Sequence, residues 1–361
     1  MSDLVGQVTE RSLPQGGRLR FVHYPSSFVV DEWTRDLSLE VTTHRQAVGV
    51  PSERLPEGAV FGALYGRDGQ LLPDSQRSKR GRSLAANARE LPAGLTENAK
   101  RVGGQTFFGG QLNPVFGHVL LEVVARFWPD LAYGEFDRIA LYASPRQIRS
   151  PRKSLTPPVL ELLSAAGVPT DRLKLFGRRP VIFANVTLST PPIVIKRCAD
   201  PRLVAPYDRI AQVFQQQHEA SGADALPARI YLSRSHLASG SRQALNESAI
   251  EAMALSRGFT IVHPQELPIG RQVALAHNAE IIAGCDGSAM HLAVFARPGT
   301  RLLALDSRIA VNQFMIDQAR GLDAVHMLAL DQVVEHHVHQ WSADLDRVAA
   351  GLDLIVDGSG S

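Results

Sequence analysis

Short apolar runs alternate with amphipathic segments along the second half of the chain. The runs are Ile230–Leu232, Phe259–Val262, Glu280–Gly284 and Arg301–Asp306, and the segments between them carry helical patterns. This alternation predicts a parallel sheet wound with helices. In open sheets of this kind, ligands bind beyond the carboxyl ends of the strands.

The first half of the chain shows a sparser version of the same alternation. It predicts strands at 59–65, 138–142, 173–176 and 181–188 and helices at 115–128 and 154–166. Residues 1–57 read as irregular, and three prolines at 189–205 indicate a crossing between domains. The sequence therefore predicts an α/β protein with two Rossmann-like domains that face a cleft. We expect residues 1–200, with their irregular N-terminal segment, to form one domain and residues 201–361 the other.

At 115–128 the polar positions fall on one narrow stripe. His118, Glu122 and Arg126 are four residues apart and share one face of a helix, whereas the other positions after His118 are apolar. A surface helix has a wider polar face, so we expect a buried helix with its stripe turned into a cleft. His118 is a candidate general base that Glu122 orients. The alternative is a His–Glu–Arg ladder that only supports the structure.

Two features of the second half indicate an anion site. Arg234 and Arg242 follow the run Ile230–Leu232, and a guanidinium recognises phosphate through paired hydrogen bonds. The turn Gly284–Ala289 opens a helix, where small residues and free N–H groups favour an anion. The alternative for both arginines is a solvated loop position. We expect a phosphorylated ligand on this half of the chain.

Asp286 complicates the anion site, because a carboxylate there would repel a phosphate. It could instead bind a sugar hydroxyl or cap the helix that follows. His291, in the first turns of that helix, is at least as readily a packed histidine as a ligand. Asn246 and Glu247 are interpreted first as a helix N-cap and a first-turn acid.

Composition adds few limits on function. The 361 residues are 44% hydrophobic and 20% charged with a net charge of +2, which is ordinary for a folded protein and gives no argument for nucleic acid. Basic residues cluster at Arg77–Arg82 and Arg146–Lys153; such clusters usually lie on solvated loops, but they could contact an anionic membrane or an acidic substrate. Cys198 and Cys285 indicate neither a disulfide framework nor a thiolate metal site. We see no secretory signal and no membrane-spanning run, and so expect a cytoplasmic protein.

A set of short motifs keeps its order and spacing across roughly half of the chain. The motifs are Gly117–His118, Leu120–Glu122, Tyr231–Arg234, Arg242, Asn246–Glu247, Gly258–Phe259, Pro264–Glu266, Gln272 with Ala279, Ile281–His291, Phe295 and Pro298–Gly299. In these motifs the chain resembles the family 61 glycosyltransferases, a group that includes bacterial capsule and exopolysaccharide biosynthesis proteins. It departs from that family at Asp286–Ala289, where His-Gly-Ala-Gly is usual, and at His291, where Asn is common.

The resemblance implies a GT-B fold, a nucleotide-sugar donor, inversion at the anomeric carbon and no obligatory metal. It favours functional roles for the candidate residues. We assign catalysis to His118 and Glu122, with either His118, backed by Glu122, or Glu122 itself as the base. We assign the donor diphosphate to Arg234, Arg242, Asp286, Gly287, Ser288, Ala289 and His291, and the acceptor side to Asn113 and Arg126.

We therefore expect an inverting, metal-independent glycosyltransferase of bacterial surface polysaccharide biosynthesis that needs no cofactor. The acceptor would be a saccharide or a lipid-linked saccharide, held on the N-terminal domain, and the C-terminal domain would hold the donor. Two alternatives stay open: a pyruvyl transferase that uses phosphoenolpyruvate, and a non-catalytic module that binds a nucleotide sugar or glycan. No nucleic-acid partner is expected, and the basic clusters could dock on the inner face of the membrane. The sequence indicates no oligomeric state.

Two motifs that suggest a metal site are rejected. Asp344 and Asp346 match a D-x-D pattern, but they fall in a helical pattern, where residues two apart point in nearly opposite directions. His337 and His339 would share one face of a strand, but no third ligand lies at a suitable spacing.

Overall fold

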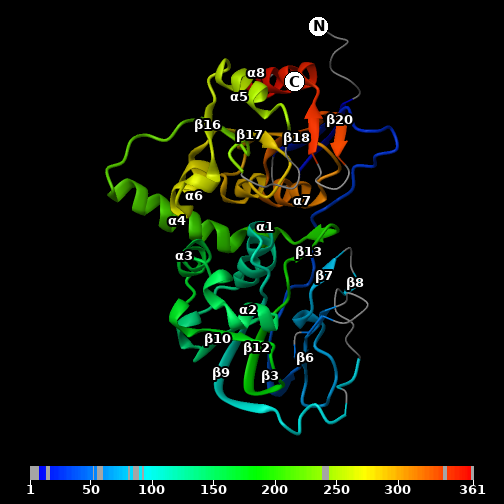
Figure 1. The fold of residues 1–361 in the computed structure, drawn as a ribbon, viewed down its shortest axis with the longest axis vertical. Coiled ribbons are helices and arrows are strands. Elements are labelled where there is room, and N and C mark those ends of the chain that lie inside the picture. Colours follow the sequence, from blue (N-terminus) through cyan, green and yellow to red (C-terminus); the bar gives the residue numbers. More distant parts are fainter. Residues whose placement is uncertain are drawn as a thin grey trace. The chain divides into compact units, whose positions relative to one another are not determined.

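The computed structural model describes residues 8–13, 17–51, 53–54, 60–79, 82–83, 89–91, 93–237, 244–335 and 340–358. Its contacts divide the chain into two compact units. The first combines the chain up to Thr34 with the chain from Ala211 onward, and the second runs from Arg35 to Ile210. Each unit holds one mainly parallel sheet with helices (Figure 1), so the predicted α/β class is confirmed.

The sheet of the first unit has the strand order β1-β2-β19-β18-β17-β15-β16. All neighbours run parallel except β1 and β2. The strands are β1 (Val8–Ser12), β2 (Arg18–Val22), β15 (Arg229–Leu232), β16 (Thr260–Val262), β17 (Ile281–Cys285), β18 (Arg301–Asp306) and β19 (Asp323–Leu328). All four apolar runs predicted as strands in the second half are therefore strands.

Helices cover both faces of this sheet (Figure 1). Helices α5 (Glu247–Leu255) and α8 (Leu345–Asp357) lie on one face, and α6 (Ile269–Asn278), α7 (Val311–Arg320) and the 3₁₀ helix η9 (Met290–Phe295) lie on the other. Alternate strand residues such as Ile281 and Ala283 pack in one cluster with Ile250 of α5 and Leu352 of α8. A sheet covered on both faces explains why its strands are continuous apolar runs. The remaining elements of this unit are η8 (Pro264–Glu266) and the paired strands β20 (Leu330–Glu335) and β21 (Gln340–Ala343). Helix α4 (Ala205–Ala220) begins in the second unit and ends in the first.

The N-terminal segment is not irregular, and that prediction is wrong. β1 and β2 pair with each other, and β2 joins β19 in parallel register. Phe21 and Val22 are fully buried there. The pairing partner of β2 is residues 323–327, at the other end of the chain, so no local pattern could reveal this strand.

The sheet of the second unit has the strand order β11-β10-β9-β12-β3-β6. The first four strands run parallel, and β3 and β6 add antiparallel pairs. The strands are β3 (Val41–Gly49), β6 (Leu64–Tyr65), β9 (Lys100–Gln111), β10 (Arg138–Tyr142), β11 (Leu173–Phe176) and β12 (Val181–Ser189). The strands predicted at 138–142, 173–176 and 181–188 are confirmed, whereas the one predicted at 59–65 is divided at Gly62.

Shorter elements complete the second unit. They are β4 (Glu53–Arg54), β5 (Val60–Phe61), η1 (Pro73–Ser75), β7 (Ser78–Lys79), β8 (Arg82–Ser83), η4 (Tyr133–Glu135), α2 (Pro145–Arg149), η5 (Pro151–Lys153), α3 (Pro157–Ala165), η6 (Thr170–Arg172), β13 (Ile193–Val194), β14 (Cys198–Ala199) and η7 (Pro201–Val204). The predicted helix at 154–166 corresponds to α3.

The segment predicted as one helix at 115–128 is helical but changes its pitch twice. α1 (Phe116–His118) passes into a π-helical turn, η2 (Val119–Val123), and then into a 3₁₀ turn, η3 (Val124–Phe127). β-branched valines at 119, 123 and 124 lower the α-helical preference here. Every residue from Val119 to Phe127 except Glu122 is buried, so the prediction of a buried helix is confirmed. A π-turn within a helix frequently marks a functional site.

Candidate active site

His118 and Glu122 are in direct contact in the second unit, at the start of this helical segment. Nδ1 of His118 meets Oε2 of Glu122. The His118 side chain is 37% exposed, whereas that of Glu122 is only 8% exposed. The predicted pair therefore exists, as an accessible imidazole with a buried carboxylate behind it.

Arg77 completes this cluster, although the sequence marked it only as a member of a basic run. Its Nε donates to Oε1 of Glu122 at 2.7 Å, and its Nη2 donates to Oε2 at 2.8 Å. The same Nη2 lies 3.4 Å from Nδ1 of His118. Both oxygens of Glu122 are thus occupied, while no described residue bonds Nε2 of His118.

The surroundings keep Glu122 ionised. Burial by itself raises the pKa of this carboxyl, but the hydrogen bonds from His118 and Arg77 and the charge of Arg77 outweigh it, so the net pKa is lowered. An ionised carboxylate on Nδ1 fixes the orientation of an imidazole and leaves Nε2 for a ligand.

Arg126 is the deeply buried member of the predicted stripe. Its Nη1 donates to the carbonyl oxygen of Ser189 at 3.0 Å, and Oγ of Ser189 donates to the carbonyl oxygen of Arg126 at 2.7 Å. Burial lowers the pKa of Arg126 to about 10, against the opposing charges of Asp74 and Glu122. Arg126, Glu122 and Arg77 line one narrow pocket, whereas His118 is not part of its wall.

Asn113 lines a larger cavity of the same unit. This cavity has a volume of about 520 Å³ and lies where β9 and β10 end. Arg77 is part of its wall as well as of the narrow pocket beside Glu122. Asn113, predicted for the acceptor side, is therefore linked through Arg77 to His118 and Glu122.

Arg234 and Gly287 meet at the edge of the first unit's sheet, after β15 and β17. Nη1 of Arg234 donates to the carbonyl oxygen of Asp286 at 3.0 Å, and a Cβ at position 287 would lie 2.2 Å from that Nη1. Only glycine leaves room for the guanidinium at this position. Arg234 is 8% exposed, and its backbone N–H donates to Oε1 of Glu247 at 2.8 Å. Arg242 lies outside the described residues.

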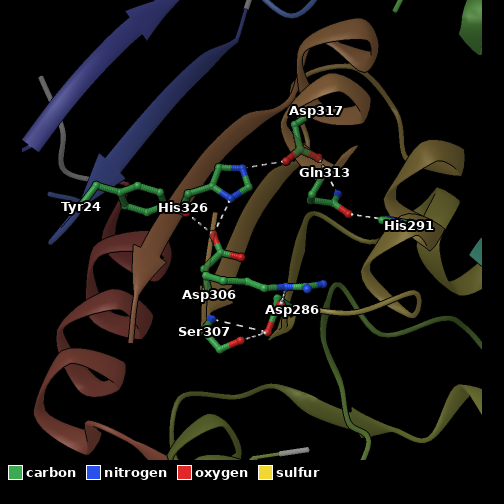
Figure 2. Close-up of polar contacts among 9 residues, drawn as sticks. Tyr24, Asp286, His291, Asp306, Ser307, Gln313, Asp317 and His326 are labelled. Carbon is green, nitrogen blue, oxygen red and sulfur yellow. Dashed lines mark hydrogen bonds and ion pairs between the residues drawn. The ribbon is translucent and has the colours of Figure 1, made fainter. Parts of the chain in front are cut away.

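The carboxylate of Asp286 is engaged on the neighbouring strand end (Figure 2). Its Oδ1 accepts a hydrogen bond from Oγ of Ser307 at 2.8 Å, and its Oδ2 lies 3.3 Å from Nε of Arg308. It does not cap the following helix, since η9 has Ala289 at its N-cap and no side-chain cap. Ser288 and Ala289 are half-buried in this turn. The negative charge that would repel an anion is thus paired with Arg308.

A family model described as Glycosyltransferase 61 matches residues 116–303, which is slightly more than half of the chain. The chain belongs to glycosyltransferase family 61. No curated protein matches the chain. Membership of family 61 implies glycosyltransferase activity, with sugar donor and acceptor substrates. The matched range includes His118, Glu122, Arg234 and the Asp286–Ala289 turn, whereas Arg77 precedes it.

His291 of this family 61 chain leads into a buried polar network (Figure 2). Its Nδ1 lies 2.9 Å from Oε1 of Gln313, and Nε2 of Gln313 donates to Oδ1 of Asp317 at 2.8 Å. Both Gln313 and Asp317 are buried on α7. The surroundings of His291 therefore agree with the alternative in which it is a packed, hydrogen-bonded histidine.

The centre of that network is His326, on β19. Its Nε2 lies 2.9 Å from Oδ2 of Asp317 and its Nδ1 lies 3.0 Å from Oδ2 of Asp306, to which the Tyr24 hydroxyl also donates at 2.7 Å. Burial alone lowers the pKa of His326, but the two carboxylates outweigh it and raise that pKa to about 9. Burial in turn raises the pKa of Asp306 and of Asp317. No sequence pattern predicted this group, and its one local indication is a lone His within the apolar strand segment Ala324–Met327.

Asn246 occupies the N-cap position of α5, as predicted, but its side chain does not cap the helix. Its amide instead makes two hydrogen bonds, of 2.8 and 2.9 Å, to the backbone of Ala343. Glu247 is buried and accepts a hydrogen bond from the backbone N–H of Arg234, so it helps to fix the position of that arginine.

The two rejected metal motifs differ in outcome. Asp344 caps α8 by accepting from the N–H groups of Asp346 and Arg347, whereas His337 and His339 lie outside the described residues. In the part of the chain that the structure describes, no group of three or more His, Cys, Asp or Glu is placed to hold a metal ion. Within the same ranges, no helix combines the length and apolar character needed to cross a membrane.

Proposed function

We propose that this chain is an inverting, metal-independent glycosyltransferase that extends a bacterial surface polysaccharide. It transfers a sugar from a nucleoside-diphosphate sugar to a saccharide or lipid-linked saccharide acceptor. The proposal includes a GT-B-like arrangement. The donor binds on the first unit, which contains the C-terminal part of the chain, and the acceptor binds on the second unit. A cytoplasmic location, with contact to the inner face of the membrane when the acceptor is lipid-linked, belongs to the same proposal.

The His118–Glu122–Arg77 cluster is the observation that carries this proposal. Inversion by single displacement needs one general base and no nucleophile on the protein. His118 serves as that base: its Nε2 takes the proton of the acceptor hydroxyl while the hydroxyl oxygen forms a bond to the anomeric carbon. The bond from that carbon to the diphosphate breaks, and the diphosphate leaves with the electron pair.

Glu122 acts as the positioning residue for this base. Both of its oxygens are occupied and its pKa is lowered, so it is a poor proton acceptor itself. Its contact with Nδ1 of His118 directs Nε2 outward. We therefore assign the base to His118 rather than to Glu122.

Arg234 and the turn Asp286–Ala289 are the proposed donor diphosphate site. They lie beyond the carboxyl ends of two neighbouring parallel strands, the usual ligand position in such sheets. The guanidinium supplies charge that stabilises the leaving diphosphate. The pairing of Asp286 with Arg308 removes the repulsion that its carboxylate would otherwise exert. Arg242 and His291 are proposed as further contacts of the donor.

Ligand-induced thermal stabilisation tests this function. A ligand that binds only the folded state raises the melting temperature by mass action. We expect one nucleoside diphosphate and its sugar ester to raise it, with and without EDTA, and Arg234→Ala to abolish that shift. Arg297→Ala is the matched control, because Arg297 precedes β18 at the opposite edge of the same sheet and its side chain is exposed.

Three outcomes would contradict the proposal. Stabilisation by phosphoenolpyruvate alone would favour a pyruvyl transferase. A nucleotide shift that EDTA removes would contradict metal independence. Stabilisation by a nucleotide sugar with no transfer to any saccharide would favour a non-catalytic binding module.

A further inference from the structure

The cavity at the ends of β9 and β10 is a feature of the second unit that the proposed proton transfer does not use. Its volume of about 520 Å³ is large enough for a small ligand group. Residues that follow β9 and β10 form its walls, together with Arg77 and the segment around η5. These two strands are parallel neighbours, so the cavity lies at the edge where α/β sheets bind ligands.

Positive charge dominates this cavity. Arg77, Arg146 and Lys153 all line it, and none of the described residues in its wall is a carboxylate. Arg77 is paired with Glu122, but neither Arg146 nor Lys153 forms an ion pair with any described residue. Two basic runs that are far apart in the sequence therefore converge on one hollow, which holds at least two uncompensated cations.

Hydrogen-bond donors accompany these cations. Oδ1 of Asn113 accepts from the backbone N–H of Val115 at 3.2 Å, and no described residue bonds its Nδ2. Ser154 lines the same cavity and is 3% exposed. A wall of guanidinium, ammonium, amide and hydroxyl donors without a carboxylate suits an anion with several acceptor oxygens.

We infer that this cavity binds a phosphate group carried by the acceptor. The assignment to the acceptor rests on the proposed function, since Arg77 joins the cavity to His118 and Glu122. Three cations around a hollow fit a phosphate or diphosphate better than a single carboxylate. A lipid-linked saccharide diphosphate and a free sugar phosphate share this chemistry. A flat anionic bilayer does not need a hollow, and it would be attracted equally by basic residues outside the cavity.

Binding of inorganic pyrophosphate, measured by calorimetry on the full chain, tests the site. We expect Arg146→Gln/Lys153→Gln to weaken this binding by about ten-fold or more, because each lost cation removes a charge-assisted contact. Arg149→Gln/Arg152→Gln is the matched control. Those two arginines belong to the same basic run and are exposed, but they do not line the cavity. The control removes the same charge and should leave the affinity within two- to three-fold (about 0.5 kcal/mol).

Equal weakening in both double variants, or in neither, would overturn the inference. Loss of pyrophosphate binding in Arg234→Ala with retention in Arg146→Gln/Lys153→Gln would also overturn it while supporting the donor site. Co-sedimentation with phosphatidylglycerol vesicles separates the sources. The parent chain could bind the vesicles but not pyrophosphate, and both double variants could lose the vesicle binding. That result would show that these basic residues bind a membrane surface and that the cavity is not a phosphate site. Pyrophosphate binding that follows the expected pattern supports a phosphate site in this cavity even if no transferase activity is found, and the absence of activity would then count against the acceptor and the proposed function alone.

Discussion

His118 and His326 both contact carboxylates, and their surroundings are opposite. His118 lies in the second unit with a 37% exposed side chain, one carboxylate and a nearby arginine. His326 lies inside the first unit, fully buried between Asp306 and Asp317 (Figure 2). Each is a close contact between an imidazole nitrogen and a carboxylate oxygen, at 2.9 to 3.0 Å for His326.

The difference shows what makes a histidine available for proton transfer. Both ring nitrogens of His326 are bonded to carboxylates, and its pKa of about 9 keeps the ring protonated at neutral pH. Such a ring has no position left for an incoming proton. Among the described residues, His118 is bonded through Nδ1, and the carboxylate beside it shares its charge with Arg77. We therefore interpret His326 as a structural ion, and this contrast supports the proposed role of His118 as the proton acceptor.

The largest expected effect comes from His118→Ala. Removal of a general base lowers kcat by about 10²–10⁴-fold, and the melting temperature should change little because the side chain is partly exposed. The measurement is the transfer rate with a donor–acceptor pair on which the parent chain is active. His44→Ala is the control, since His44 is also partly exposed in the second unit and lies on β3.

Comparable loss in the His44 variant would point to a general defect of the unit. Full activity in both His118→Ala and Glu122→Gln would refute the assignment of His118 as the base. The two histidines would then differ in exposure but not in function.

His326→Gln is expected to have the second largest effect, on stability rather than chemistry. It leaves two buried carboxylates without their counter-charge, which typically costs about 3–5 kcal/mol of unfolding free energy. Thermal or urea unfolding of the first unit measures this. The triple variant Asp306→Asn/Asp317→Asn/His326→Gln keeps polar shape without charge and should recover much of the loss. A single variant as stable as the parent chain would show that the three groups are not an ion cluster.

The fold was predictable where its determinants are local. β15, β17 and β18 appear as apolar runs because their sheet is covered on both faces, and the His118–Glu122 contact follows from a spacing of four residues. The turn at Gly287 was predictable for a similar reason, because small residues after a strand indicate a close approach.

The remainder depends on partners that are distant in sequence. Arg77 lies 45 residues from Glu122 in a polar segment with no periodic pattern. Tyr24 and Asp306 are 282 residues apart, and their contact exists only because β2 joins the sheet beside β19. The convergence of Arg77 with Arg146 and Lys153 likewise requires the order of β9 and β10 in the sheet.

The smallest expected effect is that of Arg77→Gln, which should change the pH dependence of kcat. It tests whether the carboxylate beside His118 controls the base. Arg77 lowers the pKa of Glu122 through hydrogen bonds and charge, so its removal raises that pKa. Glu122 then becomes protonated at a higher pH as the solution is acidified, and a neutral carboxyl no longer stabilises the positive charge that the His118 ring gains when it takes the proton. The acidic limb of kcat should move upward by about one pH unit or more, while kcat on the plateau changes by less than about ten-fold.

Arg77→Lys provides the control, because it keeps the positive charge and loses only the paired geometry. We expect its acidic limb to lie between those of the parent chain and Arg77→Gln. Arg77 also lines the cavity, so its loss can weaken acceptor binding and raise KM. The pH dependence of kcat is therefore measured at saturating acceptor. An unchanged limb in Arg77→Gln would mean that the ionisation of Glu122 does not control the base. His118 would then resemble His326 in having only a structural carboxylate beside it.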